Sequence, residues 1–116
     1  MKGQDIYKKA LDSLGYTDDS AIQRKALTIL TQIYDELFEA SGEKEYSPPA
    51  SLGAELKAGS KLANAYIYGV ASRLALGEGD GDQQQFFAVM YEKAKARLTR
   101  ITTVKRGRWY GYDSND

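Results

Sequence analysis

YIYGVASRLALGEGDGDQQQFFAVMY, residues 66–91, is the stretch that decides the fold of this 116-residue chain. Its first half repeats apolar side chains at the spacing of one helix face, and its second half resumes that pattern after a turn rich in glycine and aspartate. The apolar positions of the first half are Tyr66, Ile67, Val70, Ala71, Leu74 and Ala75. The pattern predicts two antiparallel helices joined by a short turn, an αα-hairpin.

Three glycines lie in the predicted turn of this hairpin, and one lies within its first helix. Gly77, Gly79 and Gly81 are expected to end the first helix, because glycine enters left-handed conformations at little cost. Asp82 is the predicted N-cap of the second helix. Gly69 lowers helix propensity by about 1 kcal/mol relative to alanine, which predicts that another helix approaches closely there. The apolar face of the second helix opens with Phe86, Phe87, Met90 and Tyr91.

The acidic turn has some features of a calcium site. Glu78, Asp80 and Asp82 alternate as ligands do in an EF-hand loop. The glycine that this loop requires next is Gln83 here, and its terminal glutamate is Val89. We therefore predict no metal ion at the turn, and we expect its carboxylates to be solvated.

The hairpin resembles a signature of small head–tail connector proteins of tailed bacteriophages and prophages, also called adaptor or head-completion proteins. The similar residues are Tyr68-Gly69-Val70-Ala71, Leu74-Ala75-Leu76, the acidic glycine turn, Gln84, Phe86 or Phe87, and Tyr91. Shorter likenesses lie in residues 5–16, 33–37 and 51–56. The resemblance thus covers most of residues 3–101.

This resemblance implies a structural role in virion assembly and no enzymatic activity or cofactor. Connector proteins of this family form a ring beneath the portal, close the DNA-filled head and present the surface for tail attachment. The implied partners are other copies of the chain in a ring of about twelve, the portal protein, a tail-side connector or stopper protein and, non-specifically, packaged DNA. The implied location is the head–tail interface of the virion, after assembly in the host cytoplasm.

The amino-acid composition excludes several kinds of metal site, cross-link and catalytic mechanism. The chain contains no cysteine and no histidine, which excludes disulfides, thiolate zinc sites and Ser-His-Asp catalysis within it. An enzyme that uses lysine or carboxylate is left open, but no converging set of titratable residues stands out. The 42% hydrophobic and 28% charged residues are typical of a soluble globular protein. No membrane-length apolar run or signal-peptide core is present, so we expect a cytosol-like compartment.

Charge is distributed unevenly although the formal net charge is zero. Residues 1–47 are rich in acidic side chains, whereas the chain from Lys93 onward is strongly basic. Such a bipolar chain suits head-to-tail association of copies or an acidic partner for the basic end. Solvated faces that balance by chance explain the composition equally well.

The amino-terminal half predicts two helices. Ile6, Ala10 and Leu14 share one face of a helix over residues 3–14, which Gly15 ends. A second helix over about 20–41 carries the stripe Ile22, Ala26, Ile29, Ile33 and Leu37, widened by Leu30, Tyr34 and Phe38. The residues available to cap its two ends are Asp18, Asp19, Ser20 and Gly42.

Residues 42–59 read as a linker because Pro48 and Pro49 cannot extend a helix. Leu52 and Leu56 are its expected anchors on the core. Eighteen residues is long for a connection in a compact domain. The pattern leaves open a packed crossover and a surface offered to a neighbouring subunit.

The predicted fold is therefore an all-α bundle of about four helices, with the hairpin helices over about 60–77 and 82–104. The second of these helices is expected to point Phe87, Met90, Tyr91, Ala94, Leu98 and Ile101 inward. We divide the chain into a helical bundle, 1–104, and an extended carboxyl-terminal arm, 105–116.

The arm, KRGRWYGYDSND, has no apolar periodicity. Cations and aromatic rings between glycines suit a segment that buries its rings on a partner protein. The same residues also suit stacking on bases beside phosphates, so the alternative function is a small helical nucleic-acid-binding module. A frayed terminus is the third interpretation. The predicted partner-binding residues are Lys105, Arg106, Arg108, Trp109, Tyr110 and Tyr112.

Overall fold

The computed structural model describes the backbone of residues 1–106 and the side chains of residues 1–98. Within this part the chain forms four helices, α1 (Gly3–Leu14), α2 (Ser20–Ser41), α3 (Ser60–Gly77) and α4 (Gly81–Arg106). The all-α bundle predicted from the apolar pattern is confirmed, and the first three helices begin and end within a residue of their predicted bounds. The only β pairing in the described part is an isolated bridge between Lys2 and Glu55.

Local sequence explains where α2 begins and where α1 and α2 end. The Asp19 carboxylate accepts a hydrogen bond of 2.8 Å from the backbone N–H of Ile22 and so caps the start of α2. Gly15 and Gly42 follow the two helices with φ of 73° and 79°, the left-handed conformation that ends many helices. Both predicted glycine stops are confirmed.

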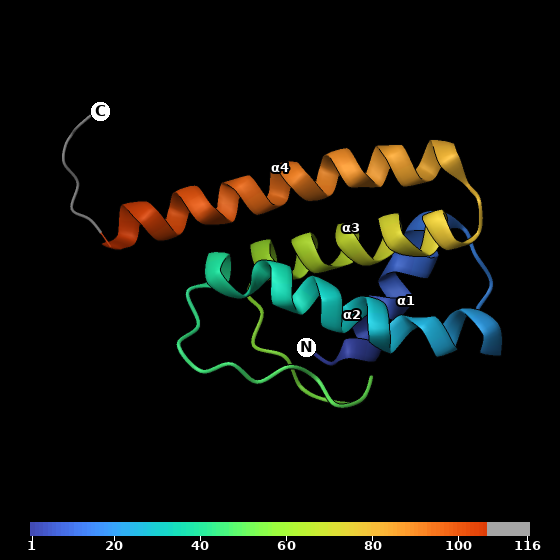
Figure 1. Ribbon diagram of the computed structural model, residues 1–116, viewed down its shortest axis with the longest axis horizontal. Helices are drawn as coiled ribbons and strands as arrows, with labels where there is room; N and C mark the ends of the chain where they lie inside the picture. Colours follow the sequence, from blue (N-terminus) through green and yellow to red (C-terminus); the bar gives the residue numbers. More distant parts are fainter. Residues whose placement is uncertain (107–116) are drawn as a thin grey trace.

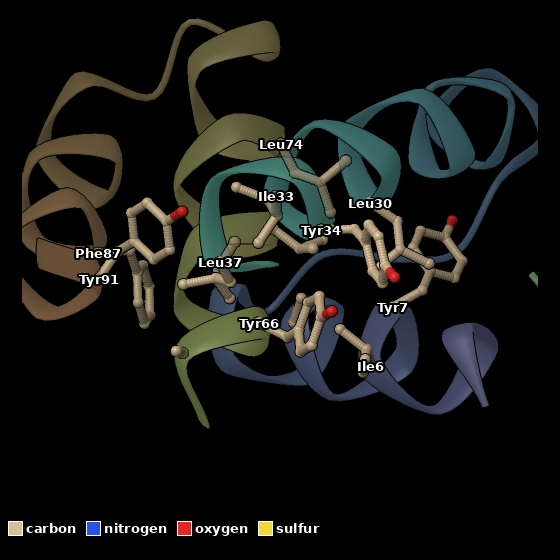
Figure 2. Packing of buried hydrophobic residues seen from close by; sticks show 14 of the residues in the cluster. Ile6, Tyr7, Leu30, Ile33, Tyr34, Leu37, Tyr66, Leu74, Phe87 and Tyr91 are labelled. Carbon is tan, nitrogen blue, oxygen red and sulfur yellow. The ribbon is translucent and has the colours of Figure 1, made fainter. Parts of the chain in front are cut away.

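Helix α3 lies at the centre of the bundle (Figure 1) and packs against each of the other three helices. Its antiparallel pairing with α4 is the most extensive of these contacts, which confirms the hairpin. The core around it combines aliphatic and aromatic side chains from all four helices, as Figure 2 shows for Ile6, Leu30, Ile33, Leu37, Tyr66, Leu74, Phe87 and Tyr91. Burial of this continuous apolar cluster supplies the main driving force for folding.

Gly69 marks a close approach between three helices. A β-carbon at this position would lie 2.8 Å from Ile33 Cδ1 of α2 and 2.9 Å from Tyr91 Cε1 of α4. Both separations are shorter than carbon atoms tolerate, so only glycine lets the three helices meet here. The close approach predicted from this glycine is confirmed.

The linker between α2 and α3 packs along the start of α1. The backbone N–H groups of Gly3 and Gln4 donate to the carbonyls of Ala54 and Leu52, and Leu56 N–H donates to the Met1 carbonyl. Leu56 is buried, and Leu52 packs partly buried against the core. Both predicted anchors are confirmed, and residues 51–56 form a packed crossover.

Helix α4 begins earlier than its sequence suggested. It starts at Gly81, and Asp80 precedes it with its carboxylate 3.4 Å from the backbone N–H of Gln83. The prediction that Asp82 caps this helix is therefore wrong. Phe86, predicted to open the inward face, is 59% exposed, because only one of two adjacent phenylalanines can point into the core and Phe87 does so.

The rest of α4 follows its predicted face. Tyr91, Ala94 and Leu98 are buried together with Phe87, while Met90 is half-buried. Ile101 lies outside the residues whose side chains are described. The helix continues two residues beyond its predicted end, to Arg106. In the described part of the chain, no helix carries an apolar stretch that could span a membrane.

Candidate functional site

One exposed face of α2 changes its charge along its length. Arg24 and Lys25 lie in its first turns, and Asp35 and Glu39 lie in its last two. At 1.5 Å per residue, Arg24 and Glu39 are about 22 Å apart along the helix. Each charged end adjoins exposed apolar side chains, and we name the two surfaces the cationic groove and the acidic aromatic end.

The cationic groove lies between the first half of α2 and the last turns of α3. It is a shallow depression, widely open to solvent, and is lined by Arg24, Lys25, Thr28, Ile29, Gln32, Arg73, Leu76 and Gly77. Leu76 is 63% exposed on its rim, and Ile29 is half-buried. Lys25 lies 3.8 Å from Glu78, an exposed pair that holds the lysine only weakly. An apolar strip between cations suits an apolar partner surface flanked by carboxylates.

The acidic aromatic end is built on three rings. Phe38 and Tyr46 pack edge to face with centroids 5.3 Å apart, and Tyr34 lies within 6.0 Å of both. The Tyr46 hydroxyl donates to Asp35, and the Tyr34 hydroxyl accepts from the backbone N–H of Ser47 at 2.7 Å. Tyr46 is thus fixed in place while its side chain stays 56% exposed. A rigid, exposed aromatic ring is typical of an interface anchor.

A cavity of about 150 Å³ opens beside these rings. Its lining includes Glu43, Glu45 and Glu55 together with Tyr34, Phe38 and Tyr66. Lys57, 3.9 Å from Glu43, is the one basic residue of the lining. Burial raises the pKa of Tyr66 above its ordinary range. The surface as a whole is acidic and aromatic.

A polar network at the surface joins α2, α3 and α4. The Arg73 guanidinium contacts both carboxylate oxygens of Glu36, at 3.0 and 2.8 Å, and the Tyr91 hydroxyl donates to the same carboxylate at 2.7 Å. Burial alone would raise the pKa of Glu36, but these bonds and the Arg73 charge lower it. Burial and the bond to Glu36 raise the pKa of Tyr91. The network therefore fixes Glu36 as a carboxylate that ties three helices together.

The acidic turn between α3 and α4 is fastened to α1. The Asp80 carboxylate accepts from the Tyr16 hydroxyl at 2.9 Å and from Gln83 Nε2 at 2.8 Å, and Gln83 also donates to the Leu14 carbonyl. The hydrogen bonds from Gln83 and Tyr16 lower the pKa of Asp80. Asp80 thus has hydrogen-bond partners within the protein while it stays partly exposed, and Glu78 and Asp82 are exposed, as expected of solvated carboxylates.

Among the described residues, no group of three or more carboxylates is arranged to hold a metal ion. The predicted partner-binding residues of the arm lie beyond the side chains that the structure describes. Lys105 and Arg106 belong to the last turn of α4, and their side chains are not described. Arg108, Trp109, Tyr110 and Tyr112 lie outside the described residues.

Sequence reasoning missed both surfaces on α2. It treated Tyr46 as part of a linker and Leu76 as part of a hairpin signature, and neither has a local pattern that predicts exposure. A usable signal was the order of charges on α2, where Arg24 and Lys25 precede Asp35 and Glu39 at positions that share a helix face. No family model, curated protein or solved structure matches the chain.

Proposed function

We propose that this protein is a structural component of virion assembly, a head–tail connector that forms a ring beneath the portal of a tailed bacteriophage or prophage. In this proposal the ring closes the DNA-filled head and presents the surface to which the tail attaches. The resemblance of residues 3–101 to connector proteins motivates the proposal. The observation that carries it in the structure is the pair of complementary surfaces on α2.

A ring needs two different surfaces that fit each other, because each copy contacts its neighbours through opposite sides. The cationic groove offers Arg24 and Lys25 around an apolar strip. The acidic aromatic end offers Glu45 next to the exposed Tyr46 ring, and Glu39 is exposed on the last turns of α2. In the proposed contact, Tyr46 of one copy enters the groove of the next while the charges pair at the rim. Rim pairs of this kind mainly set orientation and association rate.

Neutralising one surface at a time tests this contact. Variant one is Arg24→Gln with Lys25→Gln, and variant two is Glu39→Gln with Tyr46→Ala. Electron microscopy and sedimentation of the wild type, alone and mixed with its portal, are expected to show rings, and each variant is expected to fail to form them. An equimolar mixture of the two variants keeps one intact contact and is expected to give dimers without rings.

The matched control is Lys8→Gln with Lys9→Gln on α1, which removes the same charge as variant one from exposed positions that line neither surface and is expected to leave rings intact. A wild type that stays monomeric with and without portal, or stops at a symmetric dimer, contradicts the connector proposal. Rings that survive in both variants contradict only the assignment of these two surfaces.

The arm has a separate place in this proposal. Arg108 and Trp109 are of the residue types enriched at interface hot spots, and we propose that they bind the portal or the tail-side protein. Arg108→Ala and Trp109→Ala are expected to leave ring formation unchanged and to weaken portal docking or tail joining in a head-completion assay. Normal head completion by both variants would contradict this role.

A further inference from the structure

The opposite side of the hairpin, away from α2, carries a second charged feature. Phe86, Met90, Lys93 and Arg97 succeed one another on α4 at intervals of four, three and four residues, which places them on one helix stripe. Antiparallel to this stripe, Lys61, Asn64 and Tyr68 follow one another along α3. The two rows enclose a cleft between the helices.

This cleft has a volume of about 90 Å³, room for a tetrahedral oxyanion or several water molecules. Lys61, Lys93 and Arg97 line it together with Asn64, Tyr68, Met90 and Ala94, and no carboxylate lines it. Asn64 adds an amide N–H₂ and Tyr68 a hydroxyl, both hydrogen-bond donors. All the charged groups of the lining are therefore cations, and its neutral polar groups can also donate hydrogen bonds.

The three cations have no acidic partner in the described part of the chain. The ion pairs found there engage Lys25, Lys57, Arg73, Lys95 and the amino terminus. The nearest carboxylate along α4 is Glu92, and it pairs with Lys95, whose charge also acts on Glu36 of α2. Like charges grouped around one cleft repel each other, and an anion bound among them relieves that repulsion.

Aromatic rings continue the cleft toward the hairpin turn. Tyr68 lines the cleft and stacks on Phe87 with ring centroids 6.3 Å apart and planes at 27°. Phe86 packs edge to face against Phe87 at 5.0 Å, and its own ring is 59% exposed. An exposed phenylalanine one helix turn from a cationic cleft costs solvation in the free protein and offers a flat stacking surface.

We propose that this hairpin face binds single-stranded nucleic acid, with a phosphate in the cleft among Lys61, Lys93 and Arg97 and a neighbouring base stacked on Phe86. Proteins that bind single strands without sequence preference generally combine positive charge along the nucleic-acid backbone with aromatic rings on which any base can stack. A protein partner rich in carboxylates would use the cations but leave Phe86 without a role. The inference does not depend on ring formation.

The test measures binding of a short labelled oligothymidylate to the full chain by fluorescence anisotropy across a series of salt concentrations. The cleft variant combines Lys61→Gln, Lys93→Gln and Arg97→Gln, all exposed positions. We expect it to bind about tenfold or more weakly at low salt. Its slope of log affinity against log salt should fall by about 2, since single strands lose about 0.7 per neutralised phosphate contact.

The matched control combines Lys8→Gln, Lys9→Gln and Lys44→Gln, which removes the same charge from exposed positions outside the cleft. It is expected to keep the wild-type slope. Equal losses in both triple variants would reduce the effect to net charge and overturn the proposal, as would a wild type that does not bind. Displacement of the oligonucleotide by polyglutamate as efficiently, charge for charge, as by unlabelled DNA would also overturn it.

Phe86→Ala tests the stacking half of the proposal. It is expected to weaken single-strand binding about fivefold or more without changing the salt slope, and to affect a duplex of the same sequence less. Val89→Ala, an exposed apolar residue on the same helix at 49% exposure, is the control and is expected to have no effect. Tight binding of the duplex with no response to Phe86→Ala would overturn the assignment to single strands.

Discussion

Gly69 of α3 lies directly against the ring of Tyr91 of α4, so close that a β-carbon on Gly69 would come within 2.9 Å of Tyr91 Cε1. The Tyr91 hydroxyl is held by Glu36, so this ring cannot swing aside freely. The glycine lowers the helix propensity of α3 but permits the contact between three helices.

Gly69→Ala is therefore expected to destabilise the protein. Overpacking costs about 1–3 kcal/mol, which exceeds the gain of about 1 kcal/mol in helix propensity. Chemical denaturation measures the difference, with Gly77→Ala as the control because a β-carbon there meets only the flexible end of Lys25 at 3.6 Å. A Gly69→Ala variant more stable than the wild type would show that α3 and α4 can separate at no cost.

The helices themselves could be predicted from the sequence because each carries an apolar face and a local stop signal. Ile6 and Leu14, or Ile33 and Leu37, recur at helical spacing, and Gly15 and Gly42 follow directly. The cap of α4 could not be predicted in the same way. Asp80 and Asp82 are both suitable residues in a turn with three glycines. The choice depends in part on Tyr16, which is 64 residues from Asp80 in sequence and reaches it only in the folded chain.

The surfaces were harder to predict than the helices. Phe86 and Phe87 have the same hydrophobicity, and only the rotation of α4 on the core decides which one is exposed. Residues 51–56 pack on α1 through backbone hydrogen bonds, which leave no trace in side-chain patterns. The cationic groove and the acidic aromatic end combine side chains from separate segments, so their composition depends on tertiary packing.

Asp80→Ala is expected to cost about 1–2 kcal/mol, because it removes an N-cap and the acceptor for Tyr16 and Gln83 together. Asp82→Ala, two residues along, removes an exposed carboxylate without a described hydrogen bond and should change stability by less than about 0.5 kcal/mol. Thermal denaturation of both variants makes the comparison. A larger loss of stability in Asp82→Ala than in Asp80→Ala would support Asp82 as the N-cap, as the sequence predicted.

Glu36 should make the protein sensitive to acid. Its pKa is lower in the folded state, so its contribution is present above the unfolded value of about 4.3 and is lost as the pH falls through the folded value. Unfolding free energies measured from pH 7 downward should decline less steeply below about pH 5 in Glu36→Gln. The control variant is Glu39→Gln. Parallel curves of unfolding free energy against pH for Glu36→Gln and the wild type would contradict the prediction.

Alkaline conditions should unfold the protein through its tyrosines. Burial and the hydrogen bond to Asp80 raise the pKa of Tyr16 to about 12, and burial with the 2.6 Å bond to Asp18 raises the pKa of Tyr7 further. The folded pKa values of these tyrosines lie above the unfolded value of about 10. Their contribution to stability is therefore complete below about pH 10 and is lost as the pH rises through the folded pKa values.

Ultraviolet absorbance of phenolate, followed with circular dichroism, measures this effect. In Tyr16→Phe the loss of helical circular dichroism between about pH 10 and 12 should be shallower than in the wild type. Tyr68→Phe removes a hydroxyl without a described hydrogen bond and should leave the curve unchanged. Complete ionisation of the tyrosines near pH 10 with the helices still intact would show that these hydroxyls are open to solvent.

The backbone pairing of Gly3 and Gln4 with residues 52 and 54 joins positions about 50 residues apart in the chain, and closing so large a loop is entropically costly. The α3–α4 hairpin, in contrast, closes through a turn of a few residues. Local contacts form faster than distant ones, so the hairpin should fold first and α1 should dock last. The amides of Gly3, Gln4 and Leu56 would then exchange with solvent together, and earlier than those at the Gly69 crossing, which would make α1 a separately opening unit of the fold.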